Sequence, residues 1–137
     1  MPQTIFPMIA YANAAAAMDW LVRAFGFRET TRMTAPDGTV IHGELELSDA
    51  KVMLATPTPE YQGPFRHAET CEAARHWSAV PYIIDGVLVY VDDVNAHYAR
   101  AKAEGATILS DLEESQAGRR YRAADLEGHR WMFAQKQ

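Results

Sequence analysis

The sequence predicts an α+β fold in which one β-α-β-β-β pattern occurs twice within a single domain covering residues 1–137. Three observations support this prediction. A helix-forming segment with an N-capping residue before it and a glycine after it appears in each half of the chain. A short apolar segment precedes each helix, and segments of alternating polarity follow it. Matching positions keep one offset, because 79 positions separate Asn13 from Asp92 and also Gly26 from Gly105.

The first helix is predicted over residues 14–25, which read AAAAMDWLVRAF. Asn13 is a favourable N-cap, and Gly26 can adopt the left-handed conformation that commonly ends a helix. Apolar residues recur at helical spacing and predict one buried face: Met18, Leu21, Val22 and Phe25.

The second helix is predicted over residues 94–104, which read VNAHYARAKAE. Either Asp92 or Asp93 serves as its N-cap, and Gly105 ends it. The residues expected on its apolar side are Val94, Tyr98, Ala101 and Ala103.

Strands are predicted on both sides of each helix. A short apolar strand comes first, at 7–12 in one module and 86–91 in the other. After each helix, one strand leads to a turn that contains Gly38 or Gly118. Two alternating strands complete each module, at 42–49 and 51–56 in the first and at 121–125 and 129–134 in the second.

A long connection joins the two modules. We assign residues 1–57 to module one, 58–82 to the connection and 83–137 to module two. The connection should contain a short helix from Glu69 to Trp77. Connections of this length are often functional, as a lid or as an arm over a partner. Its aromatic residues either stack on a ligand, cover an apolar sheet or form a dimer interface: Tyr61, Phe65, Trp77 and Tyr82.

The composition narrows the function classes. An apolar content of 48% and a charged content of 23% are ordinary for a globular protein. The net charge of −5 argues against nucleic-acid binding and mildly favours cationic or neutral ligands, although it serves solubility equally well. No apolar run approaches the roughly 20 residues of a membrane span, and no basic segment marks a signal peptide. Because Cys71 has no internal disulfide partner, we expect a cytoplasmic protein.

Three segments, in their order and spacing, resemble a known superfamily: AMDWLVRAFGF, YVDDVNAHYARAKAEGA and DLEGHRWMF. The chain resembles the vicinal oxygen chelate superfamily, which contains glyoxalase I, extradiol dioxygenases, fosfomycin-resistance enzymes and bleomycin-resistance proteins. The resemblance implies that each module curls its sheet into half of a cup. It also implies that two paired modules enclose one cavity and that two chains form a homodimer.

Metal-dependent members of this superfamily bind a divalent cation through His, Gln or Glu at four strand positions. By resemblance, these positions fall here on Phe6, Leu54, Gly86 and Met132. None of them is a suitable ligand for a hard or borderline dication. If a strand is shifted by one residue, Asp85 is the only metal-binding residue type that reaches one of these positions. The resemblance therefore implies a metal-free branch with no cofactor.

The former ligand positions and the residues that share their strand faces should line the cavity. We expect an apolar lining in which Gly86 leaves open space: Phe6, Met8, Leu54, Leu88, Tyr90 and Met132. His42, Glu44 and Arg130 should set its polarity.

Each polar candidate has a second interpretation. His42, Glu44 and Glu46 alternate along one strand and line either the cavity or the solvent side of the sheet. Arg130 either reaches the cavity mouth or lies at a solvated strand start together with His129. A further cluster is either an anion site or a set of arginines that are solvated or paired with Glu113 and Glu114: Arg119, Arg120 and Arg122.

The function predicted from the sequence is metal-independent binding of a small organic molecule in an apolar cup, as bleomycin-resistance proteins do. One alternative is an isomerase or lyase of the glyoxalase type that uses His42 or Glu44 as its base. Another is a dimeric accessory or regulatory module. We expect no nucleic-acid or membrane partner.

Overall fold

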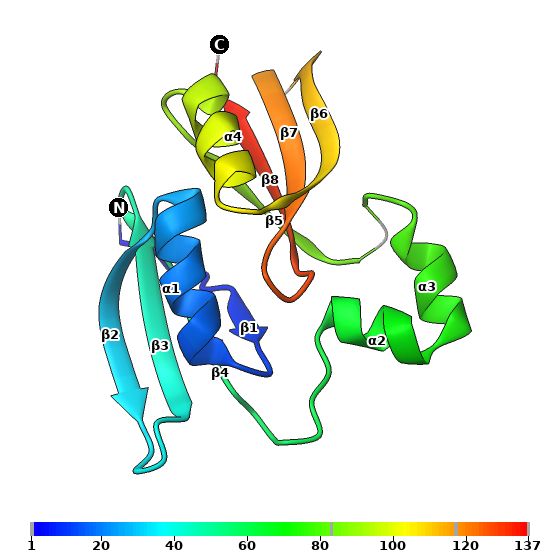
Figure 1. The fold of residues 1–137 in the computed structure, drawn as a ribbon. Helices are drawn as coiled ribbons and strands as arrows, with labels where there is room; N and C mark the ends of the chain where they lie inside the picture. Colours follow the sequence, from blue (N-terminus) through cyan, green and yellow to red (C-terminus); the bar gives the residue numbers. More distant parts are fainter. Residues whose placement is uncertain (1, 83, 117, 137) are drawn as a thin grey trace. The chain divides into compact units, whose positions relative to one another are not determined.

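In a computed structural model, which describes residues 2–82, 84–116 and 118–136, the chain divides into two compact units. Unit 1 is Met1–Gly63 and unit 2 is Pro64–Gln137 (Figure 1). Each unit contains one four-stranded sheet, and the order of elements confirms the repeated β-α-β-β-β pattern. None of the helices among the described residues has the length and apolar character needed to span a membrane.

Unit 1 holds the first copy of the pattern. Its sheet has the order β1-β4-β3-β2, with β1 parallel to β4 and the other neighbours antiparallel. The elements are β1 (Met8–Ala10), α1 (Ala14–Phe25), β2 (Arg28–Thr34), β3 (Val40–Leu47) and β4 (Ala50–Ala55).

Unit 2 holds the second copy, preceded by two short helices. Its sheet has the matching order β5-β8-β7-β6, again with a parallel pair between the first and last strands. The elements are α2 (Pro64–Thr70), α3 (Glu72–Ser78), β5 (Gly86–Tyr90), α4 (Val94–Ala103), β6 (Thr107–Ser115), β7 (Gly118–Ala124) and β8 (Arg130–Gln135).

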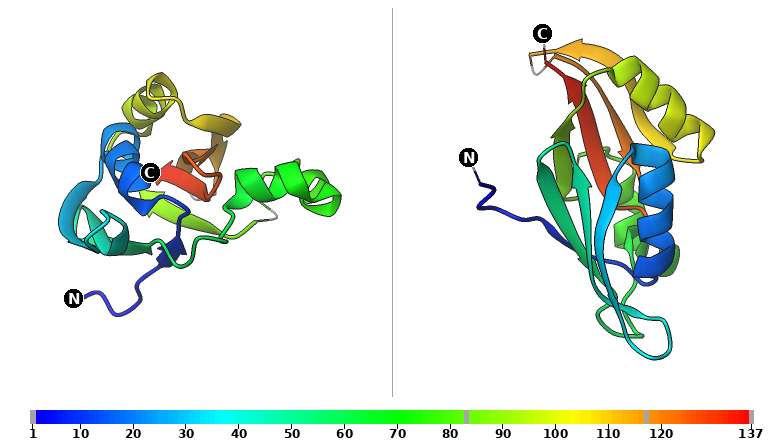
Figure 2. Two further views of the ribbon diagram at one scale, coloured as in Figure 1. Left: turned by 60° about the horizontal axis from the view of Figure 1, so that its bottom comes forward. Right: turned by 90° about the vertical axis from the view of Figure 1, so that its left-hand side faces the viewer.

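The predicted bounds and caps of α1 are confirmed. The Asn13 side chain accepts a hydrogen bond of 3.1 Å from the backbone N–H of Ala16, and Gly26 ends the helix with a φ of 82°. The helix lies across one face of the strands of unit 1, where it contacts β3 (Figure 2). Gly43 on β3 makes room for it, because a Cβ atom there would lie 2.5 Å from the Met18 sulfur.

The cap of α4 is Asp93 rather than Asp92, since the Asp93 carboxylate accepts a hydrogen bond of 3.1 Å from the Ala96 N–H. The expected burial of Ala103 is wrong, because this residue is exposed. Two residues correspond to about 200° around a helix, so Ala103 points away from buried Ala101. His97 contacts the sheet instead, with its ring centroid 4.1 Å from that of Phe133.

Aromatic side chains form the core beneath α4. Trp131 and Phe133 on β8 are parallel within 6°, and Tyr121 on β7 stacks beside Phe133. The Tyr121 hydroxyl makes a hydrogen bond of 2.6 Å with Nδ1 of His97. Burial raises the pKa of Tyr121 above its ordinary value, so this hydroxyl keeps its proton.

The connection forms two helices where one was predicted. Cys71 has an extended backbone, with a φ of −139°, and this interrupts the helical path between α2 and α3. Both helices belong to unit 2. The turn before β8 anchors α2, because the Phe65 N–H donates a hydrogen bond of 3.0 Å to the Glu127 carbonyl.

Candidate functional site

The sheet of unit 1 has one face against α1, and no helix among the described residues of unit 1 covers the other face. Strand register places Met8, Met53 and Glu44 side by side on the second face. Met8 is 79% exposed, so most of this large apolar side chain faces solvent. This open face therefore presents apolar surface next to a carboxylate.

A pocket of about 190 Å³ lies at this face. It is lined by Met8, Ile9, Ala10, His42, Met53, Leu54, Ala55 and Pro57. The pocket includes three residues that the sequence proposed for a cavity, namely Met8, His42 and Leu54.

The expected strand face of Leu54 is wrong. Leu54 contributes to the pocket lining but is only 1% exposed, and it pairs with Gly43 on the face covered by α1. The neighbouring residue, Met53, occupies the open face beside Met8. Because strand side chains alternate, an error of one residue in register moves a side chain to the opposite face.

A polar cluster lies beside this pocket. His42 Nε2 and Glu44 Oε2 are hydrogen-bonded at 2.8 Å, and Lys51 Nζ donates to Glu44 Oε1 at 3.3 Å. The bonds from His42 and then Lys51 lower the pKa of Glu44, which favours its carboxylate form. Lys51 was missed from the sequence, although alternation along β4 places it on the same face as Met53. Glu46, the third member of the alternation, pairs with Arg28 instead.

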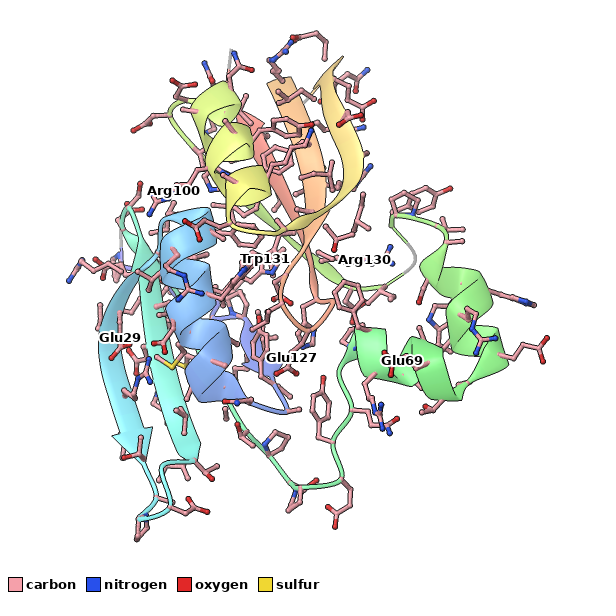
Figure 3. The ribbon with its side chains drawn as sticks, viewed as in Figure 1. Glu29, Glu69, Arg100, Glu127, Arg130 and Trp131 are labelled. Carbon is pink, nitrogen blue, oxygen red and sulfur yellow. The ribbon has the colours of Figure 1, made fainter. Side chains whose placement is uncertain are left out.

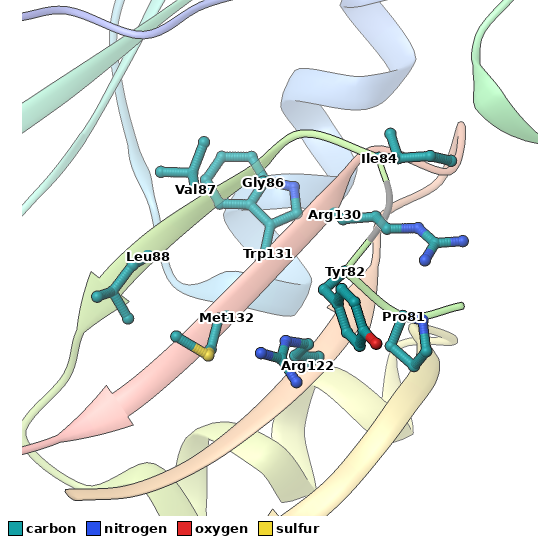
Figure 4. A pocket seen from close by; sticks show the side chains of 10 residues that line it. All are labelled: Pro81, Tyr82, Ile84, Gly86, Val87, Leu88, Arg122, Arg130, Trp131 and Met132. Atoms are coloured by element: carbon teal, nitrogen blue, oxygen red, sulfur yellow. The ribbon is translucent and has the colours of Figure 1, made fainter. Parts of the chain in front are cut away.

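The sheet of unit 2 also has an open face with a pocket of about 190 Å³ (Figure 4). Register aligns Gly86 with Arg130 and Leu88 with Met132, so these four predicted residues lie on one face. The pocket is lined by Pro81, Tyr82, Ile84, Gly86, Val87, Leu88, Arg122, Arg130, Trp131 and Met132. Among the described residues, Phe6, Glu44 and Tyr90 line neither pocket.

Arg130 fits neither of its two interpretations completely. It is only 7% exposed, so a solvated strand start is wrong. Its two terminal nitrogens each donate a hydrogen bond of 2.7 Å, Nη1 to the Val80 carbonyl and Nη2 to the Ser78 carbonyl. Burial lowers the pKa of this guanidinium. Arg130 thus ties the segment after α3 to β8, while Trp131 leaves the strand on the opposite side (Figure 3).

Gly86 does not leave the open space that was expected. A Cβ atom at this position would lie 3.2 Å from the Arg130 carbonyl oxygen, because β5 and β8 run close together there. The glycine therefore permits a close approach of two backbones, and a large side chain at this position would disturb the strand pair.

Arg122 and Tyr82, for which the sequence left several interpretations open, both line the pocket of unit 2. The prediction that the arginine cluster pairs with glutamates is confirmed for Arg119 with Glu114 and for Arg120 with Glu113. Arg122 instead lies in the pocket, with its guanidinium 6.0 Å from the ring centroid of Tyr82. Alternation along β7 places Arg122 on the same face as Arg120, and this signal was available in the sequence.

The strand positions expected to bind a divalent metal carry no ligand side chains, and His42 and Glu44 alone are too few for a metal site. Apolar and thioether side chains occupy the central positions of the outer strand pairs, with Met8 beside Met53 and Leu88 beside Met132. In the part of the chain that the structure describes, no three His, Cys, Asp or Glu side chains gather closely enough to hold a metal ion. The donor set therefore does not fit the cation used by metal-dependent relatives.

Comparison with known proteins identifies the family. The sequence model of one protein family, the Glyoxalase/Bleomycin resistance protein/Dioxygenase superfamily, matches residues 5–133. The chain belongs to this superfamily. An uncharacterised protein of Mycobacterium bovis is 34% identical over 130 residues, which cover 94% of this chain and 80% of the relative.

Solved structures show the same architecture. TioX from Micromonospora sp. ML1 is 33% identical, with a TM-score of 0.71 and coverage of 98% of this chain and 97% of TioX. A bleomycin-binding protein from Streptomyces verticillus, solved with copper(II)-bleomycin, is 15% identical with a TM-score of 0.61 and covers 100% of both chains. At this lower identity, the similarity concerns the fold alone.

Proposed function

We propose that the protein binds a small organic molecule without a metal, using the open sheet faces. One observation carries the proposal: large apolar side chains such as Met8 and Leu88 stay exposed on the open sheet faces, where each contributes to a pocket. Exposed apolar surface costs free energy in water, so its presence next to a pocket favours a binding site. The bleomycin-binding protein of the same fold supports this function by analogy.

The size of the pockets sets the size of the group that each one holds. Each has a volume of about 190 Å³. Sites for whole drug-sized molecules have about 300–1,000 Å³. We therefore expect each pocket to hold a ring or a short apolar segment, packed against methionine and leucine side chains.

The proposal includes three further properties. Metal independence is proposed because apolar side chains and a glycine occupy the four strand positions that bind the cation in metal-dependent members of the superfamily. A homodimer would cover part of the exposed apolar surface. A cytoplasmic location agrees with a single cysteine, Cys71, which has no internal partner for a disulfide.

The proposal is tested with a variant in which a larger side chain occupies the pocket of unit 2. Leu88 is 45% exposed on the open face, so Leu88→Trp adds bulk over the pocket without disturbing the core. Calorimetry with the neutral probe 2-naphthamide should show a loss of affinity of about tenfold, because the indole occupies the space of the probe. Elemental analysis of the same samples should find no stoichiometric divalent metal.

The matched control is Leu126→Trp, which introduces the same side chain at a residue of 46% exposure in the turn before β8, outside the pocket. It should bind 2-naphthamide as the wild type does. If Leu88→Trp also binds with wild-type affinity, the ligand does not bind at this face.

A second candidate function rests on the His42–Glu44 hydrogen bond. A carboxylate that orients a histidine beside a pocket is an arrangement for proton abstraction. The lowered pKa of Glu44 makes it the weaker base, so His42 is the candidate base and Glu44 its orienting partner. Proton exchange at the carbon next to a ketone in D₂O, followed by NMR, separates the functions. A binding protein leaves exchange at the buffer rate, and an enzyme accelerates it in a manner that His42→Gln removes.

A further inference from the structure

Two arginines contribute to the pocket of unit 2, within a lining that is otherwise largely apolar. Arg122 comes from β7 and Arg130 from β8, and both belong to the pocket (Figure 4). The whole chain has a net charge of −5, so this local positive charge runs against the average of the molecule. The pocket therefore has a polarity that the composition did not predict.

Arg122 has no acidic partner among the described residues, in contrast to its neighbours on β7. Arg119 is 2.9 Å from Glu114, and Arg120 is 3.2 Å from Glu113. Register places Arg122 between Ser110 on β6 and Met132 on β8, neither of which carries charge. Its guanidinium lies over the ring of Tyr82 instead, which leaves its donors available to a ligand.

Arg130 adds a second positively charged side chain to the pocket lining. Its terminal nitrogens bond to the carbonyls of Ser78 and Val80, but its Nε is buried without a hydrogen-bond partner in the described chain. The side chain is more than nine-tenths buried, and it too has no carboxylate partner among the described residues. Arg130 therefore contributes positive charge to the pocket wall, while its donors are either bonded to backbone carbonyls or buried below the surface.

Together these residues point to the class of ligand. We propose that the pocket of unit 2 binds the acidic group of an aromatic carboxylic acid, with the guanidinium of Arg122 pairing the carboxylate. The ring of the ligand packs against Tyr82, Leu88 and Met132. This inference rests on the proposed function and specifies the ligand, because a planar carboxylate matches the fork of a guanidinium and an apolar lining favours a ring.

A cationic ligand is disfavoured in this pocket, since it would lie beside two positive groups with no carboxylate in the lining. The net charge of the chain mildly favoured cationic or neutral ligands, but the local charge of this pocket favours an anionic group. Neutral aromatic molecules can enter, but they gain only the apolar contacts.

The test compares three probes of one shape: 2-naphthoate, 2-naphthamide and 2-naphthylmethylammonium, measured by calorimetry at neutral pH and low ionic strength. We expect naphthoate to bind about tenfold more tightly than the amide, and the ammonium to bind most weakly. Arg122→Gln should lower naphthoate affinity about tenfold and leave amide affinity unchanged.

Arg119→Gln is the control, because it removes the same charge from the same strand at a side chain that bonds to Asn95 of α4 and to Glu114. It should leave naphthoate binding unchanged. Equal losses in the two variants, or equal affinity for naphthoate and naphthamide in the wild type, would overturn the assignment of an acidic ligand while leaving the binding function standing. If none of the three probes binds, both the assignment and the proposed binding function fail for this face.

Discussion

Asp125 shows how one buried side chain determines the geometry of the turn before β8. Its Oδ1 accepts hydrogen bonds from the backbone N–H groups of Glu127 and His129, and its Oδ2 accepts one from Nε1 of Trp131. It is 2% exposed. The acidic residue that opens the DLEGHRWMF segment therefore has a structural role, and it orients the strand that carries Arg130 and Met132.

Asp125→Ala should lower the free energy of unfolding by about 3 kcal/mol or more, because it leaves three N–H groups without their acceptor. Urea denaturation measures this loss. Asp37→Ala is the comparison, since the Asp37 carboxylate accepts a hydrogen bond from the Thr39 N–H in an exposed turn, where water can replace the lost acceptor. Similar losses in both variants would show that the Asp125 network contributes little.

At the scale of elements, the contact between α1 and β3 depends on a glycine, Gly43, which has no side chain. An added Cβ at Gly43 would lie 2.5 Å from Sδ and 2.8 Å from Cε of Met18. Met18 is fully buried, so its thioether has little room to move away. The glycine is thus part of the packing between helix and sheet, and its backbone conformation is one that any residue can adopt.

Gly43→Ala should cost about 1–3 kcal/mol of unfolding free energy through overpacking. The sharper measurement is a double-mutant cycle with Met18→Ala, which removes the atoms that the new methyl group meets. In that background, Gly43→Ala should be nearly neutral or stabilising. A cost of the same size with and without the Met18 side chain would place the strain elsewhere.

The elements could be predicted from the sequence because their signals are local. Asn13 and Gly26 mark the two ends of α1, and alternation identifies the strands of both sheets. The face of Leu54 could not be predicted in the same way, since strand phase depends on pairing with β3. The constraint on Gly86 and the bonds of Arg130 likewise arise from residues distant in the chain.

At the scale of the whole molecule, the two units repeat one arrangement with different chemistry on their open faces. Unit 1 presents His42 and Glu44 beside methionines, and unit 2 presents Arg122 and Arg130 beside Leu88 and Met132. The repeated backbone pattern was accessible from the sequence. The difference in polarity between the two faces could not be predicted, because it depends on which arginines pair with glutamates in the folded chain. Similar scaffolds therefore do not imply similar ligands for the two faces.

The exposed apolar surface also predicts the assembly of the chain. Ile5, Phe6 and Met8 follow one another closely in the chain and are all exposed, and clustered apolar surface marks association sites. We expect a homodimer with two-fold symmetry, so light scattering at micromolar concentration should give about twice the 15.3 kDa of one chain.

Met8→Asp should shift the mass toward that of one chain, because the dimer would bury an unpaired carboxylate. Leu126→Asp makes the same chemical change in an exposed turn and should leave the dimer intact. A wild-type mass of one chain across the concentration series would contradict the dimer, and a dimer that tolerates Met8→Asp would exclude β1 from its interface.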